Sequence, residues 1–297
     1  MFRFLFIIFF FIGIQNVQAQ KAVHWAQYIR LSPGFMGPNA LPVPEVKRGM
    51  VTNQVETTIA FESHINPGDM TQNLFFEAVV PLAKDLVSVV ASMVPVEFWK
   101  MNQEIMDERL TRDVDGQDVS VGDLYLGTDF RVIRNRNKLP DITLSMRFKI
   151  PSGSDLDDAR FTDAGGYFLN AGFGKSFSGN ERKAETRLYG HLGFYVWQTS
   201  DFFHRQNDAF AFGLGAESTW EKFEVSNEFS GYAGYFGNRD RPLVYRLKLS
   251  ARPGRFEPHI RYQFSHNTIM YHTIRVGCSY VFERSFKLLN RKRDTNL

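Results

Sequence analysis

The segment DITLSMRFKI, Asp141–Ile150, decides the fold. Its apolar residues occupy every second position from Ile142 to Ile150, and the positions between them are polar or charged. Strict alternation over a stretch of this length predicts a β-strand with one apolar face and one polar face.

Twelve runs of this kind follow one another along the chain, and no helical periodicity separates them. They lie near residues 54–63, 71–81, 85–99, 120–134, 140–151, 164–177, 185–198, 208–220, 222–235, 241–252, 256–266 and 269–283. Most are longer than a usual soluble strand and suit a tilted strand that crosses a membrane, which needs about 9–11 residues. The connections after even-numbered runs are mostly short, and those after odd-numbered runs are often longer and more acidic, as in outer-membrane barrels. The sequence therefore predicts an all-β fold, a transmembrane antiparallel up-and-down β-barrel of about twelve strands of the outer-membrane type.

The N-terminus predicts export. Arg3 precedes the apolar stretch Phe4–Ile14, and Val17-Gln18-Ala19 supplies small residues for cleavage. An apolar stretch of this length is typical of a signal peptide over residues 1–19, cleaved after Ala19, and it favours this interpretation over a membrane anchor. The residue directly after the cleavage site is Gln20 and not a cysteine, which argues against a lipoprotein. We therefore expect residues 54–283 to form the barrel in the outer membrane of a Gram-negative bacterium, in contact with lipid.

Composition excludes several classes of protein. Cys278 is the only cysteine, so no disulfide framework exists. A net charge of +3 gives no reason to expect nucleic acid as a partner. Residues 20–53 are rich in proline and glycine and predict neither a regular helix nor a central strand. Two interpretations of this segment stay open, a plug inside the barrel and a periplasmic tether, and residues 284–297 are expected to form a basic periplasmic tail.

The charged face of the runs distinguishes two kinds of barrel. A soluble barrel or sandwich would point its apolar face inward, whereas a membrane barrel points it toward lipid. Aromatic residues near run ends, such as Trp99, Trp197 and Trp220, favour the membrane barrel because they resemble interfacial girdles. The residues expected to line the lumen and form a polar path are Glu56, Glu62, Glu77, Asp123, Asp129, Arg131, Arg147, Lys149, Arg187, His191, Glu217, Glu224, Glu228, Arg246, Lys248, His259, Arg261 and Arg275.

These lumen charges are expected to pair across neighbouring runs. Arg147 and Lys149 should lie beside Asp123 and Asp129. The glutamates of the eighth and ninth runs should adjoin the cations of the tenth, Arg246 and Lys248. Such pairs would either seal the bore or line a narrow polar path.

The last run carries an insertion signal. Gly277, Tyr280 and Phe282 fit the spacing of a glycine followed by two aromatics, which resembles the C-terminal β-signal that the barrel insertion machinery reads. We expect Tyr280 and Phe282 to face lipid and Arg275 to face the lumen.

A further resemblance rests on Gly122-Asp123-Leu124 with Gly127, followed by the stretch Lys149–Gly153, KIPSG. This pattern resembles the outer-membrane barrel family named for the meta-cleavage pathway of phenol degradation, closely over about 60 residues and elsewhere only as barrel pattern. The stretch Gly37–Glu45 indicates a lineage-specific subgroup. The resemblance implies an outer-membrane protein that moves small molecules, and it implies no catalytic residue.

An enzyme of the outer-membrane lipid hydrolase class is the least favoured interpretation. A serine nucleophile needs a base within hydrogen-bond reach. Neither Ser265 with His266 nor His272 with Thr273 places a serine and a histidine two positions apart, and His204 and His266 fall near outer loops. No nucleotide-binding, zinc or catalytic cysteine motif is present. The acidic loop with Asp155, Asp157 and Asp158 lacks the order of a defined calcium loop and predicts a solvated loop without metal.

The sequence thus predicts a passive conduit or transporter for small molecules, hydrophobic ones among them, without a cofactor. A structural or adhesive barrel without transport is the alternative that stays open.

Overall fold

The computed structural model describes residues 28–112, 114–134, 139–178, 184–201, 203–268 and 270–282. The predicted signal peptide, residues 20–27 and the predicted basic tail lie outside the described residues. The strands are β1 Glu56–Asn66, β2 Asp69–Ala83, β3 Val87–Met101, β4 Gln117–Ser120, β5 Leu124–Ile133, β6 Asp141–Ile150, β7 Gly166–Ser178, β8 Ala184–Gln198, β9 Gln206–Trp220, β10 Phe223–Ala233, β11 Leu243–Ala251, β12 Phe256–His266 and β13 His272–Val281. The helix α2 spans Gln103–Arg109.

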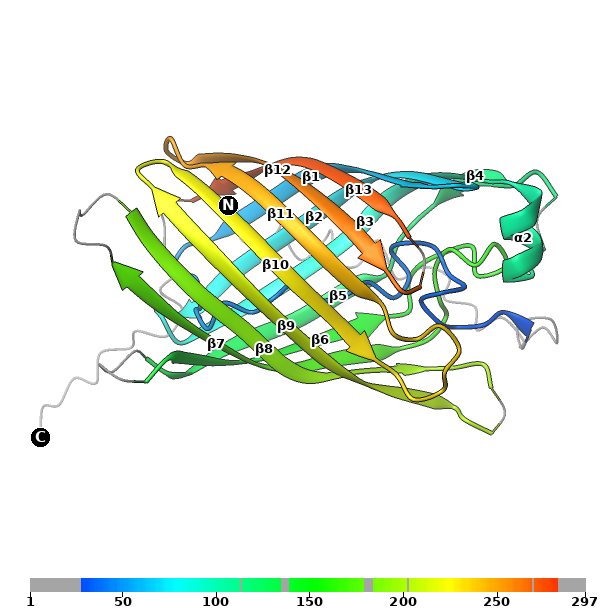
Figure 1. Cartoon of the computed structure of the whole chain (residues 1–297), viewed down its shortest axis with the longest axis horizontal. Helices are drawn as coiled ribbons and strands as arrows, with labels where there is room; N and C mark the ends of the chain where they lie inside the picture. Colours follow the sequence, from blue (N-terminus) through cyan, green and yellow to red (C-terminus); the bar gives the residue numbers. More distant parts are fainter. Residues whose placement is uncertain are drawn as a thin grey trace, which may run out of the picture.

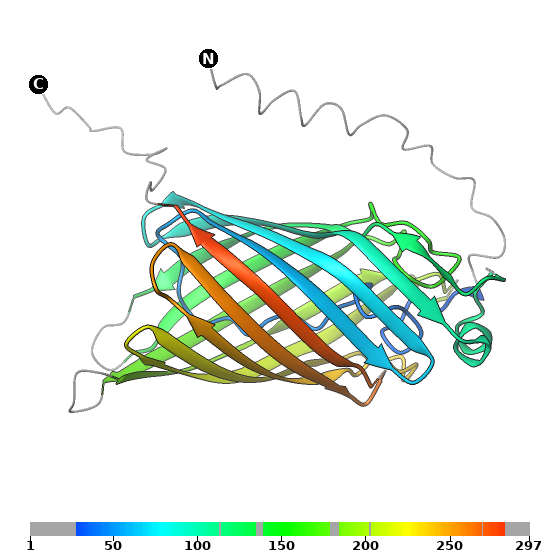
Figure 2. The ribbon, with the colours of Figure 1, turned by 90° about the horizontal axis from the view of Figure 1, so that it is seen from above.

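Twelve strands form a closed antiparallel barrel (Figures 1 and 2). Each pairs with its neighbours in the chain, and β1 pairs with β13, from Glu56 opposite Val281 to Ile65 opposite His272. The short strand β4 extends the pairing of β3 beyond the point where β5 begins. Closure leaves these strands without a free edge, as a membrane requires. The predicted fold class is therefore confirmed.

The apolar faces of the strands point outward. Leu214 keeps 69% of its surface exposed and Ile59 keeps 60%, although both lie in the middle of long strands. Such exposure of large apolar side chains is costly in water and suits contact with lipid. Among the described residues, the structure has no helix with the length and apolar character needed to cross a membrane.

The two ends of the barrel differ in their connections. The end that we call the short-turn end carries residues 84–86, 221–222 and 252–255, and β1 begins and β13 finishes there. The end that we call the long-loop end carries residues 102–112 with α2, 114–123, 151–165, 199–201, 203–205 and 234–242. At the short-turn end Asn53 accepts a hydrogen bond from the Asp85 amide (2.7 Å), which supports the left-handed conformation of Asp85 in its turn.

Two of the expected girdle aromatics are placed differently by the structure. Trp99 and Trp197 are buried inside the barrel, at 3% and 1% exposure, so the expectation that they face lipid is wrong. Each instead donates its indole N–H within the protein, Trp99 to Ser120 and Trp197 to the Leu31 carbonyl. Trp220, in contrast, is 61% exposed on the outer face, as expected.

Candidate functional site

Seventeen of the eighteen residues expected in the lumen have their side chains on the inner face of the barrel strands, and Asp123 lies buried just before β5. Their outward-facing neighbours along each strand are more exposed, as Phe130 is beside Asp129 and Arg131. That these residues carry a solute stays a prediction. Their immediate surroundings, however, are occupied by another part of the chain.

Residues 29–51, which we call the inner segment, run through the barrel (Figures 1 and 2). Near its start, at the long-loop end, the Ile29 carbonyl accepts a hydrogen bond from Ser200 (2.8 Å). Farther on, the Leu41 carbonyl accepts a hydrogen bond from the Tyr232 hydroxyl (2.7 Å). Near its other end, the Arg48 carbonyl accepts two from the Arg187 guanidinium (2.9 and 3.1 Å). The segment therefore crosses the interior before the chain enters β1 at the short-turn end.

The half of the inner segment at the long-loop end is apolar. Ile29, Met36 and Leu41 are each exposed by 4% or less and belong to a hydrophobic cluster. Leu31 and Ala40 of the inner segment also belong to it, and its remaining members come from the inner face of the wall and from the connection between β6 and β7: Ala159, Ala164, Phe168, Tyr195, Trp197, Ala209, Ala211 and Tyr232. Burying a large apolar side chain contributes about 1.5–3 kcal/mol. This packing places the apolar half of the inner segment against the wall at the long-loop end.

The half at the short-turn end is charged, and each charge meets the opposite charge on the wall. Glu45 lies 2.5 Å from Arg261, measured from its Oε1 to the guanidinium NH1. Lys47 lies 3.6 Å from Asp129, and Arg48 lies 2.6 Å from Glu217. The inner segment therefore complements the wall electrostatically as well as by shape.

Arg48 also accounts for a difference from the expected ion pairs. The glutamates of β9 and β10 were expected to adjoin Arg246 and Lys248. Glu228 of β10 does lie directly opposite Arg246 of β11, but the ion pairs that the structure describes for Glu217 and Glu224 join them to Arg48 and Arg252. Arg246 instead donates to the Val43 carbonyl of the inner segment (2.7 Å). The inner segment supplies partners for these charged wall residues, and such partners cannot be inferred from the order of the strands.

The expected pairs between β5 and β6 are present. Arg147 lies 2.7 Å from Asp129, and Lys149 lies 2.6 Å from Asp123. Asp123 also accepts hydrogen bonds from the backbone amides of Ser152 (3.0 Å) and Gly153 (2.9 Å). Asp123, Lys149, Ser152 and Gly153, which belong to the stretches that carry the family resemblance, thus form one group of contacts. These contacts join the connection after β6 to the start of β5.

A buried charge cluster at the long-loop end was not anticipated from the sequence. Arg160, in the connection between β6 and β7, lies 2.6 Å from Glu97 and 3.2 Å from Asp69, and Arg109 of α2 lies 2.7 Å from the same aspartate. The Tyr271 hydroxyl donates to Asp69, and burial together with this carboxylate raises the pKa of Tyr271. No sequence pattern joins these residues, because they come from separate strands and loops. The cluster holds the loops over the barrel mouth.

The inner segment takes part in this cluster through one side chain. Asn39 donates hydrogen bonds to Glu97 (2.6 Å) and to Asn73 (3.1 Å). The contact links the apolar half of the inner segment to β2 and β3. Movement of the segment would therefore leave the Glu97 carboxylate with one partner fewer.

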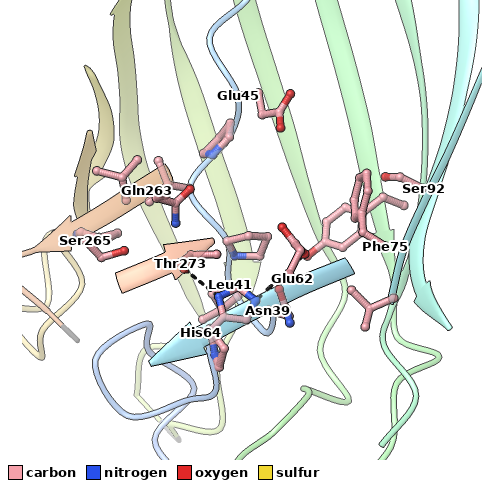
Figure 3. A pocket seen from close by; sticks show the side chains of 18 of the residues that line it. Asn39, Leu41, Glu45, Glu62, His64, Phe75, Ser92, Gln263, Ser265 and Thr273 are labelled. Carbon is pink, nitrogen blue, oxygen red and sulfur yellow. Dashed lines mark hydrogen bonds and ion pairs between the residues drawn. The ribbon is translucent and has the colours of Figure 1, made fainter. Parts of the chain in front are cut away.

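A cavity of about 250 Å³ lies between the inner segment and the wall (Figure 3). Pro42, Pro44 and Phe75 contribute apolar surface to its lining. Glu45 and Glu62 point their carboxylates toward it in Figure 3. The cavity therefore combines apolar surface with charged groups that the inner segment and the wall both supply.

The candidate nucleophiles and bases do not come together. Ser265 faces the interior, whereas His266 is exposed on the outer face. The exposed His272 contacts the Tyr262 hydroxyl (2.7 Å), and His191 accepts a hydrogen bond from the Lys47 amide (3.3 Å). In the part of the chain that the structure describes, these contacts give the histidines structural partners.

The other candidate ligands lie at the long-loop end or in the lumen. His204 is an exposed loop residue 3.5 Å from Asp201, and His259 lies buried on the inner face of β12. The carboxylates of Asp155, Asp157 and Asp158 lie within 4.8 Å of one another, with Asp157 exposed. Exposed acidic groups commonly gather in this way without an ion.

Comparison with known proteins supports the fold. No family model matches the chain, and no curated protein matches it. The COG4313 outer membrane channel from Pseudomonas putida F1 is similar over 82% of this chain and 97% of that one, with a TM-score of 0.57 and 11% identity. The structure named KdgM porin matches over 76% of this chain and 99% of that one, with a TM-score of 0.45 and 11% identity. The likeness to the Pseudomonas protein is one of fold, an outer-membrane type barrel, and the resemblance to the phenol-degradation family stays a prediction.

Proposed function

We propose that this protein is an outer-membrane channel for small molecules and that its own inner segment closes it. The observation that carries the proposal is the course of the inner segment, which runs through the barrel from the long-loop end to the short-turn end. A barrel of about twelve strands lies between the eight that side chains alone fill and the sixteen that leave an open aqueous pore. A closing segment of the chain would therefore be needed to keep such a lumen shut. The name of the Pseudomonas protein, an outer membrane channel, agrees with this proposal.

The inner segment could leave without breaking the wall. It contributes no strand to the barrel, because β1 begins at Glu56 and pairs directly with β13. Its contacts with the strands of the wall are hydrogen bonds that involve a side chain, ion pairs and apolar packing, and backbone hydrogen bonds join Gly34 to Arg239 and Gly37 to Ala159 in the connections at the long-loop end. Water can replace the polar contacts. The charged wall residues would then line an aqueous path.

The test compares the intact chain with a variant that lacks residues 29–51 and keeps the same signal peptide. Both proteins are purified in detergent and reconstituted in planar lipid bilayers, and their conductance is recorded. We expect discrete, lasting conductance steps from the variant and rare, brief openings from the intact chain. A second variant that lacks residues 283–297, which include the predicted basic tail, is the control and should behave as the intact chain does.

The absence of conductance would contradict the proposal only if the shortened barrel is folded. Folding is checked by the shift in gel mobility on heating, which a closed barrel gives in detergent. A folded variant without conductance would favour a structural or adhesive barrel.

A further inference from the structure

Glu45 of the inner segment lies against a pair of arginines on the wall. Arg261 of β12 and Arg275 of β13 are direct cross-strand neighbours. The NH1 atom of Arg261 lies 2.5 Å from the Glu45 carboxylate, and that of Arg275 lies 3.5 Å from it. Like charges directly opposite each other destabilise a sheet. The arginine pair therefore depends on nearby carboxylates.

A second carboxylate, that of Glu62, completes the cluster. Its Oε1 atom lies 2.5 Å from the Nε of Arg275 and 3.2 Å from the NH2 of Arg261. Two guanidinium groups thus meet two carboxylates, and their charges balance.

The two carboxylates differ in how they are held. Glu62 belongs to β1, and its side chain is only 3% accessible, so it stays with the wall. Glu45 belongs to the inner segment, and its side chain is 59% accessible because it borders the cavity. If the inner segment leaves, Glu62 balances only one of the two guanidinium groups. The other positive charge then needs an anion.

The surroundings of the arginine pair suit an organic anion. The Phe75 ring lies 4.2 Å from the Arg275 guanidinium carbon, and both border the cavity with Pro42 and Pro44. Guanidinium groups recognise carboxylates through paired hydrogen bonds, and their planar faces stack on aromatic rings. An apolar body could lie in this cavity while its carboxylate meets the arginines.

We propose that Arg261 and Arg275 form a carboxylate-binding site that Glu45 occupies in the closed barrel. A small organic carboxylate with an apolar body would compete with Glu45 for this site and favour displacement of the inner segment. The inference rests on the proposed function in that it takes the inner segment to be the closing element. It names the class of solute that would act on that element.

The test measures binding, not transport. Fluorine NMR follows 4-fluorobenzoate and the neutral probe 4-fluorobenzamide with the purified full mature chain in detergent. Glu45→Gln removes the tethered carboxylate and keeps the size of the side chain. Because the probe no longer competes with a tethered group, we expect Glu45→Gln to bind 4-fluorobenzoate about tenfold or more tightly than the intact chain. Binding of 4-fluorobenzamide should stay the same.

Two variants provide the controls. Glu77→Gln removes a carboxylate that lines the same cavity, and Glu77 forms no ion pair with the arginine pair among the contacts that the structure describes. It should raise the affinity for 4-fluorobenzoate far less than Glu45→Gln does. The double variant Glu45→Gln with Arg261→Gln leaves one guanidinium beside Glu62, so its charges balance again and the gain in affinity should disappear.

A further measurement uses the intact chain and needs no variant. Excess 4-fluorobenzoate should speed hydrogen exchange of the Lys47 amide, and 4-fluorobenzamide should not. The inference is overturned if Glu45→Gln gains nothing, if the neutral probe gains equally, or if the double variant keeps the gain. Conductance after deletion of the inner segment would stand in each of these cases, so the two proposals fail separately.

Discussion

Replacing Arg48 by glutamine tests whether charge pairs hold the inner segment in place. The Arg48 guanidinium lies 2.6 Å from Glu217 and 3.7 Å from Glu224. Glu224 keeps a second partner, Arg252, at 2.6 Å. Among the ion pairs that the structure describes, Glu217 is joined only to Arg48, and its side chain is 9% accessible. The Arg48→Gln variant therefore removes the ion-pair partner of a buried carboxylate whenever the segment is in place.

The size of the effect follows from the burial of this pair. Removing one partner of a buried charge pair costs about 2–5 kcal/mol. The Arg48 side chain is 28% accessible, which favours the lower end of this range. In the displaced state, water fills the lumen and hydrates Glu217, so the cost falls on the closed state alone. About 2 kcal/mol corresponds to a displaced population roughly 30-fold larger.

Hydrogen exchange of the protein in lipid nanodiscs measures that population. The Gly37 amide donates to the Ala159 carbonyl (2.8 Å) and the Lys47 amide donates to His191 (3.3 Å), so both are protected only while the segment is in place. When closing is faster than exchange, the exchange rate is proportional to the displaced population. We expect both amides to exchange roughly 30-fold faster in Arg48→Gln, by the conversion above.

The control for this experiment is Arg30→Gln. Arg30 lies in the same segment and carries the same charge, but it is exposed at the long-loop end. Its replacement should leave the exchange of both amides close to that of the intact chain. The double variant Arg48→Gln with Glu217→Gln should recover much of the protection, because no unpaired carboxylate remains. Equal exchange in Arg48→Gln and Arg30→Gln would refute the charge-pair reasoning.

Two further predictions concern assembly and stability. Tyr280→Ala combined with Phe282→Ala should reduce the fraction of folded barrel in outer-membrane extracts, while deletion of residues 283–297 should leave it intact, and equal assembly of the two would contradict the insertion signal. Arg160→Gln removes the cation that Glu97 and Asp69 share, which should cost about 3–5 kcal/mol of folded-state stability. The temperature at which the folded gel band disappears should therefore fall. An unchanged temperature would mean that the cluster does not stabilise the fold.

The barrel was predictable because alternation is a local property of each strand. The run expected at residues 140–151 matches β6, Asp141–Ile150, and neighbouring runs in an up-and-down barrel are neighbouring strands. The same reasoning placed Arg147 beside Asp129 and Lys149 beside Asp123. Inference from strand order succeeded for these two pairs, although Lys47 of the inner segment also approaches Asp129.

The placement of Trp99 failed because a bulge changes which positions face inward. On β2 the single residue Phe75 lies between Leu74 and Phe76, which pair with Val96 and Met93 of β3. Two residues of β3 therefore oppose one of β2, as in a β-bulge, and the alternation shifts by one position. Ser88 faces inward before the bulge and Trp99 faces inward after it. A girdle assignment made from the position along a run alone cannot register such a shift.

Trp197 could have been placed correctly. It is separated by an even number of positions from His191, which the sequence analysis assigned to the lumen. Both side chains are buried inside the barrel, at 1% and 0% exposure. The error came from giving an aromatic residue near a strand end more weight than the alternation of the strand itself.

The course of the inner segment lies beyond what periodicity can predict, because a proline-rich stretch has no repeating face. Its own charges nevertheless carry information once the wall is known. Glu45 meets the basic inner face of β12 and β13, while Lys47 and Arg48 meet carboxylates on β5 and β9. A tether outside the barrel would not need charges that are opposite to those of the wall residues inside it.

The two halves of the inner segment have different roles under these proposals. The apolar half keeps the lumen closed, and the charged half responds to solutes. The apolar half excludes water from the long-loop end, and its burial depends little on solutes or salt. The charged half lies next to the point where the segment joins β1, and its ion pairs can be exchanged for solute or water. Under the two proposals, a carboxylate at Arg261 and Arg275 would weaken the charged half first. Full opening would still require the release of Ile29, Met36 and Leu41 from their cluster, so single changes in the charged half should raise the frequency of opening without leaving the barrel permanently open.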